Sequence, residues 1–254
     1  MPLPNRRWTP RPRPGHHDAM HIYFLQHAAG LGPARFADWL DSMGHSHNSC
    51  HLYAGEAPPR LADCDALVLL DGDLAVDDTA THPWLAREKK LLTRALKSGK
   101  PVLGVGMGAR LIAEGLGAIV SRGTYPALGW QRIELAPESP FDLPETFEAF
   151  SWQRDIFGLP DGALPLGGSE ASPLQGFAWD RGRVVALQCH LEATDASISA
   201  LFEHLAAQTH AGASPLEGLH VQAPEAILAD TRRVDHQAAL LDRLMVQWLR
   251  SVAR

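Results

Sequence analysis

The chain has 254 residues, of which 45% are hydrophobic and 20% charged, and its formal net charge is −6. This composition is typical of a globular protein, and the length suffices for one large α/β domain with a substantial core. Since the chain has no basic field and no apolar run near the roughly 18 to 20 residues that span a bilayer, we expect neither nucleic acid nor a membrane as a partner.

The first 19 residues differ from the rest of the chain. They contain five prolines and four arginines and have no hydrophobic period. They also lack the apolar segment of a signal peptide. We interpret residues 1–19 as a disordered arm and residues 20–254 as one domain.

The first half of the folded part alternates between strand and helix patterns. Short continuous apolar runs are typical of strands that are covered on both faces, as in a parallel sheet. Such an alternation predicts a doubly wound α/β domain whose functional residues lie at the carboxyl ends of the strands. The expected strands are residues 21–26, 49–54 and 65–71, and the expected helices are residues 33–43 and 83–97.

The pattern changes after Gly117. Shorter strands separated by Pro and Gly turns are expected to complete the sheet and to add antiparallel strands. They are residues 119–135, 145–152, 176–179 and 183–188, followed by helices over 193–210 and 231–252. The last helix carries an apolar stripe that packs either in the core or against a second copy, so the oligomeric state stays open.

Residues 100–117 read as a buried strand, a glycine turn and a helix. That is the build of a nucleophile elbow, in which a strained turn presents one residue and small neighbours allow close packing. The turn resembles the elbow of the class I glutamine amidotransferases, Gly-x-Cys-x-Gly-x-Gln. Here it reads Gly104-Val105-Gly106-Met107-Gly108-Ala109-Arg110, so Gly106 stands at the position of the nucleophilic thiol and Arg110 at that of the glutamine.

A second segment carries the same resemblance. Gln188-Cys189-His190-Leu191-Glu192 resembles the family's Gln-x-His-Pro-Glu. In that family a cysteine thiolate attacks the glutamine side-chain amide, a histidine moves the proton and a carboxylate orients the histidine. The match implies that His190 is the base and Glu192 its orienting group. The alternative is a His and a Glu that hydrogen-bond at the surface.

The resemblance covers most of residues 20–192, with further matching segments at 65–73, 82–88, 128–130 and 152–160. It is strongest to the stand-alone proteins related to the glutaminase part of GMP synthase. It implies a three-layer, flavodoxin-like α/β domain with a mostly parallel central sheet.

The implied site departs from the family at four places. Besides Gly106 and Arg110, Asp71-Gly72-Asp73 replaces the oxyanion loop Gly-Gly-Pro, and Gln153 replaces the histidine of Trp-His-x-Asp. Acidic side chains beside the oxyanion position oppose the negative charge that acyl transfer develops there. We expect Arg110, Asp71 and Asp73 to pair as a charge cluster. The implied oxyanion and pocket residues are Gly72, Asp73, Met107, Arg110 and Gln153.

Three other patterns give weaker indications of function. Cys189 is expected to be a buried structural cysteine, and three scattered cysteines predict no disulfide framework and a reducing, cytoplasmic compartment. Residues 45–51 contain three histidines and a cysteine, for which we weigh metal binding against solvated loop histidines and favour the latter. The glycines of 104–108 lack the spacing of a nucleotide-binding loop. No metal and no cofactor is expected.

The sequence thus predicts an amidotransferase-like protein that lacks glutaminase activity because position 106 is glycine. It would act by binding glutamine, a related small ligand or a separate partner enzyme. The alternative is a working amidotransferase or hydrolase that uses His190 and Glu192 with an unrecognised nucleophile or an activated water.

Overall fold

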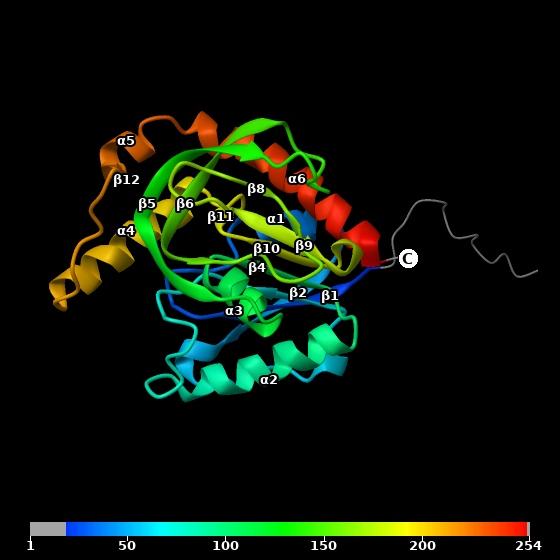
Figure 1. Ribbon diagram of the computed structural model, residues 1–254. Helices are drawn as coiled ribbons and strands as arrows, with labels where there is room; N and C mark the ends of the chain where they lie inside the picture. Colours follow the sequence, from blue (N-terminus) through cyan, green and yellow to red (C-terminus); the bar gives the residue numbers. More distant parts are fainter. Residues whose placement is uncertain (1–18, 253–254) are drawn as a thin grey trace, which may run out of the picture.

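The computed structural model of the protein describes residues 19–252, so the arm expected at residues 1–19 lies almost wholly outside the described part of the chain. A seven-stranded sheet forms the middle of the molecule, with strand order β2-β1-β3-β4-β10-β9-β7. The β1, β2, β3, β4 and β10 strands pair in parallel, and β9 joins antiparallel. The predicted α/β fold with a mostly parallel central sheet is confirmed (Figure 1).

The first half alternates between strand and helix as predicted. Its elements are β1 (His21–Gln26), α1 (Arg35–Ser42), β2 (Ser46–His51), β3 (Ala66–Leu69), α2 (Pro83–Lys97), β4 (Val102–Val105) and α3 (Met107–Gly115). The prediction for β2 was wrong at both ends. Residues 52–54 form a short 3-10 turn that Gly55 closes with a φ of 88°, and the strand instead begins at the polar Ser46, paired with His21. An edge strand with largely polar side chains gives no apolar run to detect.

The second half builds a further sheet. Its elements are β5 (Val120–Leu135), β6 (Thr146–Phe157), β7 (Leu164–Pro165), β8 (Gly167–Gly168), β9 (Gly176–Trp179), β10 (Val184–Leu187), β11 (Cys189–His190), α4 (Asp195–His210), β12 (His220–Val221), α5 (Pro224–Leu228) and α6 (Arg232–Val252). The predicted range of β5 agrees with the structure to within one residue, whereas β6 runs five residues past its predicted end. The two strands pair antiparallel in a sheet of order β11-β6-β5-β12. Turn-forming residues inside β5 are tolerated because the register shifts between Arg122 and Ala127.

Two apolar clusters cover the two faces of the central sheet. Helices α1 and α6 pack on one face with β6, and helices α2 and α3 pack on the other. The stripe on α6 is buried within the chain; Met245 is fully buried and the indole N–H of Trp248 donates to the carbonyl of Arg183 at 3.0 Å. Among residues 19–252, no helix is long and apolar enough to cross a membrane.

The order of the strands determines where the site forms. Strands β3, β4 and β10 are neighbours and run in the same direction, so their carboxyl ends lie side by side. The segments that follow them, residues 70–75, residue 106 and residues 188–192, therefore meet at one edge of the sheet.

Candidate functional site

The turn between β4 and α3 needs glycine at two positions. Gly106 precedes the first residue of α3 and has φ 52° and ψ −113°, a conformation that residues with a Cβ rarely adopt. A Cβ on Gly108 would lie 2.1 Å from the carbonyl oxygen of Leu69, so only glycine allows α3 to approach β3 this closely. The strand, the tight turn and the helix that the sequence predicts here are all present.

The carboxylate of Asp71 lies at the N-terminus of α3. Its Oδ1 accepts hydrogen bonds from the backbone N–H of Met107 at 2.6 Å and from that of Gly72 at 2.8 Å. The positive end of the helix dipole favours a negative group at this point. Two converging backbone N–H groups form the arrangement that stabilises an oxyanion. In this chain the anion between them is the side chain of Asp71.

The same carboxylate occupies the space in front of Gly106. A Cβ added to Gly106 would lie 2.1 Å from Oδ1 and 2.2 Å from Cγ of Asp71. Real Cβ atoms do not approach other atoms this closely, so a side chain at position 106 and Asp71 in this place exclude each other. The sequence predicted that Asp71 and Asp73 oppose negative charge at the implied oxyanion position. In the structure the carboxylate of Asp71 itself lies between the N–H groups of Gly72 and Met107.

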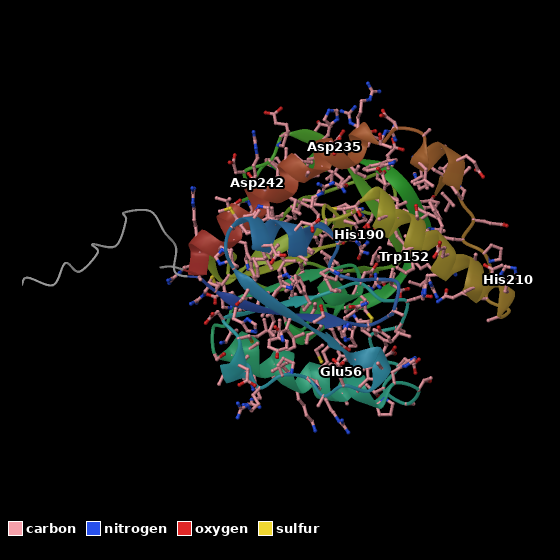
Figure 2. The ribbon with its side chains drawn as sticks, turned by 180° about the vertical axis from the view of Figure 1, so that it is seen from behind. Glu56, Trp152, His190, His210, Asp235 and Asp242 are labelled. Carbon is pink, nitrogen blue, oxygen red and sulfur yellow. The ribbon has the colours of Figure 1, made fainter. Side chains whose placement is uncertain are left out.

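His190 and Glu192 lie together as the resemblance implies. The Nδ1 of His190 is 2.8 Å from Oε1 of Glu192, and its Nε2 is 3.3 Å from Oδ2 of Asp71, a contact without hydrogen-bond geometry. His190 is 6% and Glu192 7% exposed, so the alternative of a surface pair is wrong. Figure 2 labels His190 next to α4, close to Trp152, and both residues line one cavity.

The ionisation of this group is set by burial and by its partners. Burial alone would lower the pKa of His190, but Glu192 and then Asp71 raise it to about 10. Burial alone would raise the pKa of Asp71, yet His190, Arg110 and the N–H of Met107 hold it below its ordinary value. At neutral pH the structure therefore holds an imidazolium between two carboxylates.

Arg110 completes this buried group of charges. Its Nη2 is 3.8 Å from Oδ1 of Asp71 and 3.4 Å from the carbonyl of Gly72, which it approaches as a donor. Two buried cations, Arg110 and His190, thus face two buried carboxylates. The expected cluster of Arg110, Asp71 and Asp73 forms only in part, because the ion pair of Asp73 is with His204, at 3.7 Å.

Two cavities adjoin Asp71. One, of about 460 Å³ with its mouth included, has mostly apolar walls that include Leu31, Phe150 and Trp152, together with His190. The other, of about 710 Å³ with its mouth included, has polar walls. Its lining comprises the loop 71–75, Arg110, Arg122, residues 152–155, Gln208 and Ala213. Four of the five predicted pocket residues, Gly72, Asp73, Arg110 and Gln153, therefore line one space, whereas the side chain of Met107 is fully buried outside that lining.

A buried pair below the site was missed from sequence. His27 and Glu88 are almost completely buried, and Nε2 of His27 is 2.8 Å from Oε1 of Glu88. The Nδ1 of His27 is 2.8 Å from the carbonyl of Leu70, the residue before Asp71. Burial alone would lower the pKa of His27, but Glu88 and the Leu70 carbonyl outweigh that effect. The pKa is therefore raised above its ordinary value. The available signal was Glu88 itself, which lies three residues from both Leu85 and Leu91 on the apolar face of α2.

The remaining candidates have structural roles. Cys189 is fully buried, and burial and then Glu192 raise the pKa of its thiol to about 12, which fits the predicted structural cysteine. The interpretation of solvated loop histidines was wrong for two residues. His45 is buried and stacks on Trp39, and His47 lies in β2. No group of three or more His, Cys, Asp or Glu in residues 19–252 is arranged to hold a metal.

Comparisons with known proteins agree with one another. The sequence profile of the family "Glutamine amidotransferase class-I" matches residues 49–204, more than half of the chain. The glutamine amidotransferase-like protein YfeJ of Salmonella typhimurium is 29% identical over 196 residues, which cover 73% of this chain and 81% of that protein. The GMP synthase of Aeropyrum pernix is 32% identical over 142 residues, which are 54% of this chain but only 25% of that enzyme.

Solved structures show the same likeness. A glutamine amidotransferase from Thermotoga maritima superposes with a TM-score of 0.81 at 25% identity, over 94% of this chain and 100% of that one. A glutamine amidotransferase from Methylobacillus flagellatus gives a TM-score of 0.82 at 22% identity, over 92% and 96% of the two chains.

Proposed function

The chain belongs to the class I glutamine amidotransferase family, and we propose that it has no glutaminase activity and acts by binding a small ligand in the polar cavity beside Asp71. Position 106 carries no thiol, and function depends on the groups in the site and not on the fold. The proposal further places this chain in the cytoplasm and gives it no cofactor.

One observation carries the proposal. The Asp71 carboxylate accepts hydrogen bonds from the N–H groups of Met107 and Gly72 and fills the space in front of Gly106. A substrate carbonyl would need the same N–H groups to stabilise its oxyanion. Since a fixed negative charge already occupies them, both the nucleophile and the stabilisation of the transition state are missing.

The neighbouring groups support the same conclusion. A histidine whose pKa is about 10 is protonated at neutral pH and is unable to take a proton from a thiol or a water. Cys189, the cysteine next to His190 in the chain, is fully buried, and its pKa of about 12 keeps the thiol protonated. A hydrolase that uses an activated water is disfavoured for the same reason, because His190 is its base.

Release of glutamate from glutamine tests the proposal. The native chain and Gly106→Cys are assayed beside the double variant Asp71→Gly/Gly106→Cys, in which the thiol gains the space that Asp71 now fills. We expect no release from the native chain and none from Gly106→Cys, and a gain of activity in the double variant. Clear release from the native chain that is lost in His190→Ala would overturn the proposal.

A further inference from the structure

The polar cavity beside Asp71 has a floor of buried hydrogen-bond donors. It lies between the loop 71–75, α3, β6 and the C-terminal end of α4. Arg110 comes from α3 and is 6% exposed, and Gln153 comes from β6 and is 2% exposed. Both side chains are thus more than nine-tenths buried at the inner end of the cavity.

These donors are not satisfied within the described part of the chain. A guanidinium carries five N–H donors, but Arg110 reaches only the carbonyl of Gly72 at 3.4 Å and Asp71 at 3.8 Å, and its Nε has no partner. The Nε2 of Gln153 has no partner either. Buried donors without acceptors are costly, so this floor fits a ligand that brings acceptor oxygens.

Arg154 also lines this cavity, and its guanidinium has no ion pair among the residues that the structure describes. The Nη2 of Arg154 donates to the backbone carbonyl of Ser214 at 3.0 Å, and this is its one hydrogen bond within residues 19–252. The neighbouring Asp155 pairs with Arg122 at 3.4 Å. Asp73 has only the 3.7 Å contact with His204. Besides the Arg122–Asp155 pair, the cavity is therefore lined by two guanidinium groups, those of Arg110 and Arg154, and by two carboxylates. Of these carboxylates, Asp71 is engaged by Met107 and Gly72, and Asp73 is only loosely paired.

We propose that this cavity binds an acidic amino acid. Its side-chain carboxylate meets Arg110 and the amide N–H of Gln153, its second carboxylate meets Arg154, and its ammonium group meets Asp73. The planar guanidinium matches a carboxylate with two parallel hydrogen bonds. Glutamine presents a neutral amide to Arg110 and binds more weakly. This inference rests on the proposed binding function and names its ligand class.

Isothermal titration calorimetry with L-glutamate, L-aspartate and L-glutamine tests the proposal. We expect an acidic amino acid to bind the native chain at least about tenfold more tightly than glutamine. Arg110→Gln should weaken that binding at least about tenfold and remove the preference over glutamine. Arg243→Gln, the same change at an exposed position of α6, should bind as the native chain does.

Arg154→Gln provides a second variant, because Arg110 also contacts Asp71 and its loss could unfold the chain. Because Arg154 is half-buried, its substitution should leave the melting temperature of the ligand-free chain unchanged. The same substitution should lower the affinity for the acidic amino acid. Equal affinity for glutamine and glutamate, or no binding of either acidic amino acid, would overturn the inference. The glutamate-release assay on the same samples tests the absence of glutaminase activity separately. Its outcome does not depend on which ligand the cavity binds.

Discussion

Asp71 and Gly106 share one space. The carboxylate of Asp71 lies where the side chain of residue 106 would begin, with its Oδ1 2.1 Å from an added Cβ. The two residues are 35 positions apart in the sequence and follow neighbouring strands of the central sheet. Their identities are therefore coupled, and a change at either one has to be considered together with the other.

The first prediction concerns this coupling. Gly106→Cys should lower the free energy of unfolding by about 1–3 kcal/mol, because the new side chain adopts a φ of 52° and collides with Asp71. Adding Asp71→Gly removes the collision, so the cost of the cysteine should be smaller in that background by about 0.5–3 kcal/mol. Urea denaturation of the four chains in this double-mutant cycle measures the difference. Strictly additive effects would show that the two positions do not compete.

The second prediction concerns the charge on His190. Asp71→Asn keeps an oxygen that accepts from Met107 and Gly72 but removes one of the two carboxylates that raise the pKa of His190 to about 10. The pKa of His190 should therefore fall, as measured by NMR titration of its imidazole. Asp77→Asn, an exposed change in the following segment, serves as control and should leave it in place. An unchanged value in Asp71→Asn would mean that Glu192 alone sets the pKa.

The third prediction is a dependence of stability on pH. Because the pKa of His190 is raised from 6.5 to about 10 on folding, its stabilisation is complete below pH 6.5, declines as the pH rises and is lost above pH 10. The pKa of Asp71 is lowered from 3.8, so its stabilisation is present above that pH and is lost in more acidic solution. The free energy of unfolding should therefore be highest between about pH 3.8 and pH 6.5. Denaturation at pH 5, 7, 8 and 9 measures it, and His190→Gln should flatten the decline above pH 6.5.

The fourth prediction concerns the buried pair below the site. Glu88→Ala leaves His27 buried without its carboxylate and should cost about 3–5 kcal/mol of stability. Glu203→Ala, an exposed change on α4, should cost less than about 0.5 kcal/mol. Thermal unfolding of both chains gives the comparison. A small effect of Glu88→Ala would show that His27 is neutral and well accommodated without its partner.

The sequence predicted the elements whose side chains have a clear period. The bounds of β1, α2 and β9 agree with the structure residue for residue. An apolar run marks β1, and Pro83 and Gly99 mark the two ends of α2. Strand β2 was misplaced because its polar side chains lie at the edge of the sheet. The range of β5 was predicted, but its pairing with β6 was not, because the register shift between Arg122 and Ala127 depends on the partner strand.

The contacts of the candidate site also differ in how far the sequence predicted them. The contact of His190 with Glu192 follows from two nearby positions at the end of a strand, and the sequence pattern indicated it. The place of Asp71 depends on how two loops from separate strands meet, and no local pattern encodes such a meeting. Sequence reasoning therefore singled out residues that meet in the structure, and the structure was needed to show that Asp71 lies between the two backbone N–H groups.

The mutual exclusion of Asp71 and a side chain at position 106 also limits which single substitutions this turn accepts. A cysteine introduced at position 106 meets a filled space for as long as Asp71 keeps its present place. A chain of this fold that carries a thiol at this turn therefore has to place a different side chain, or none, at position 71.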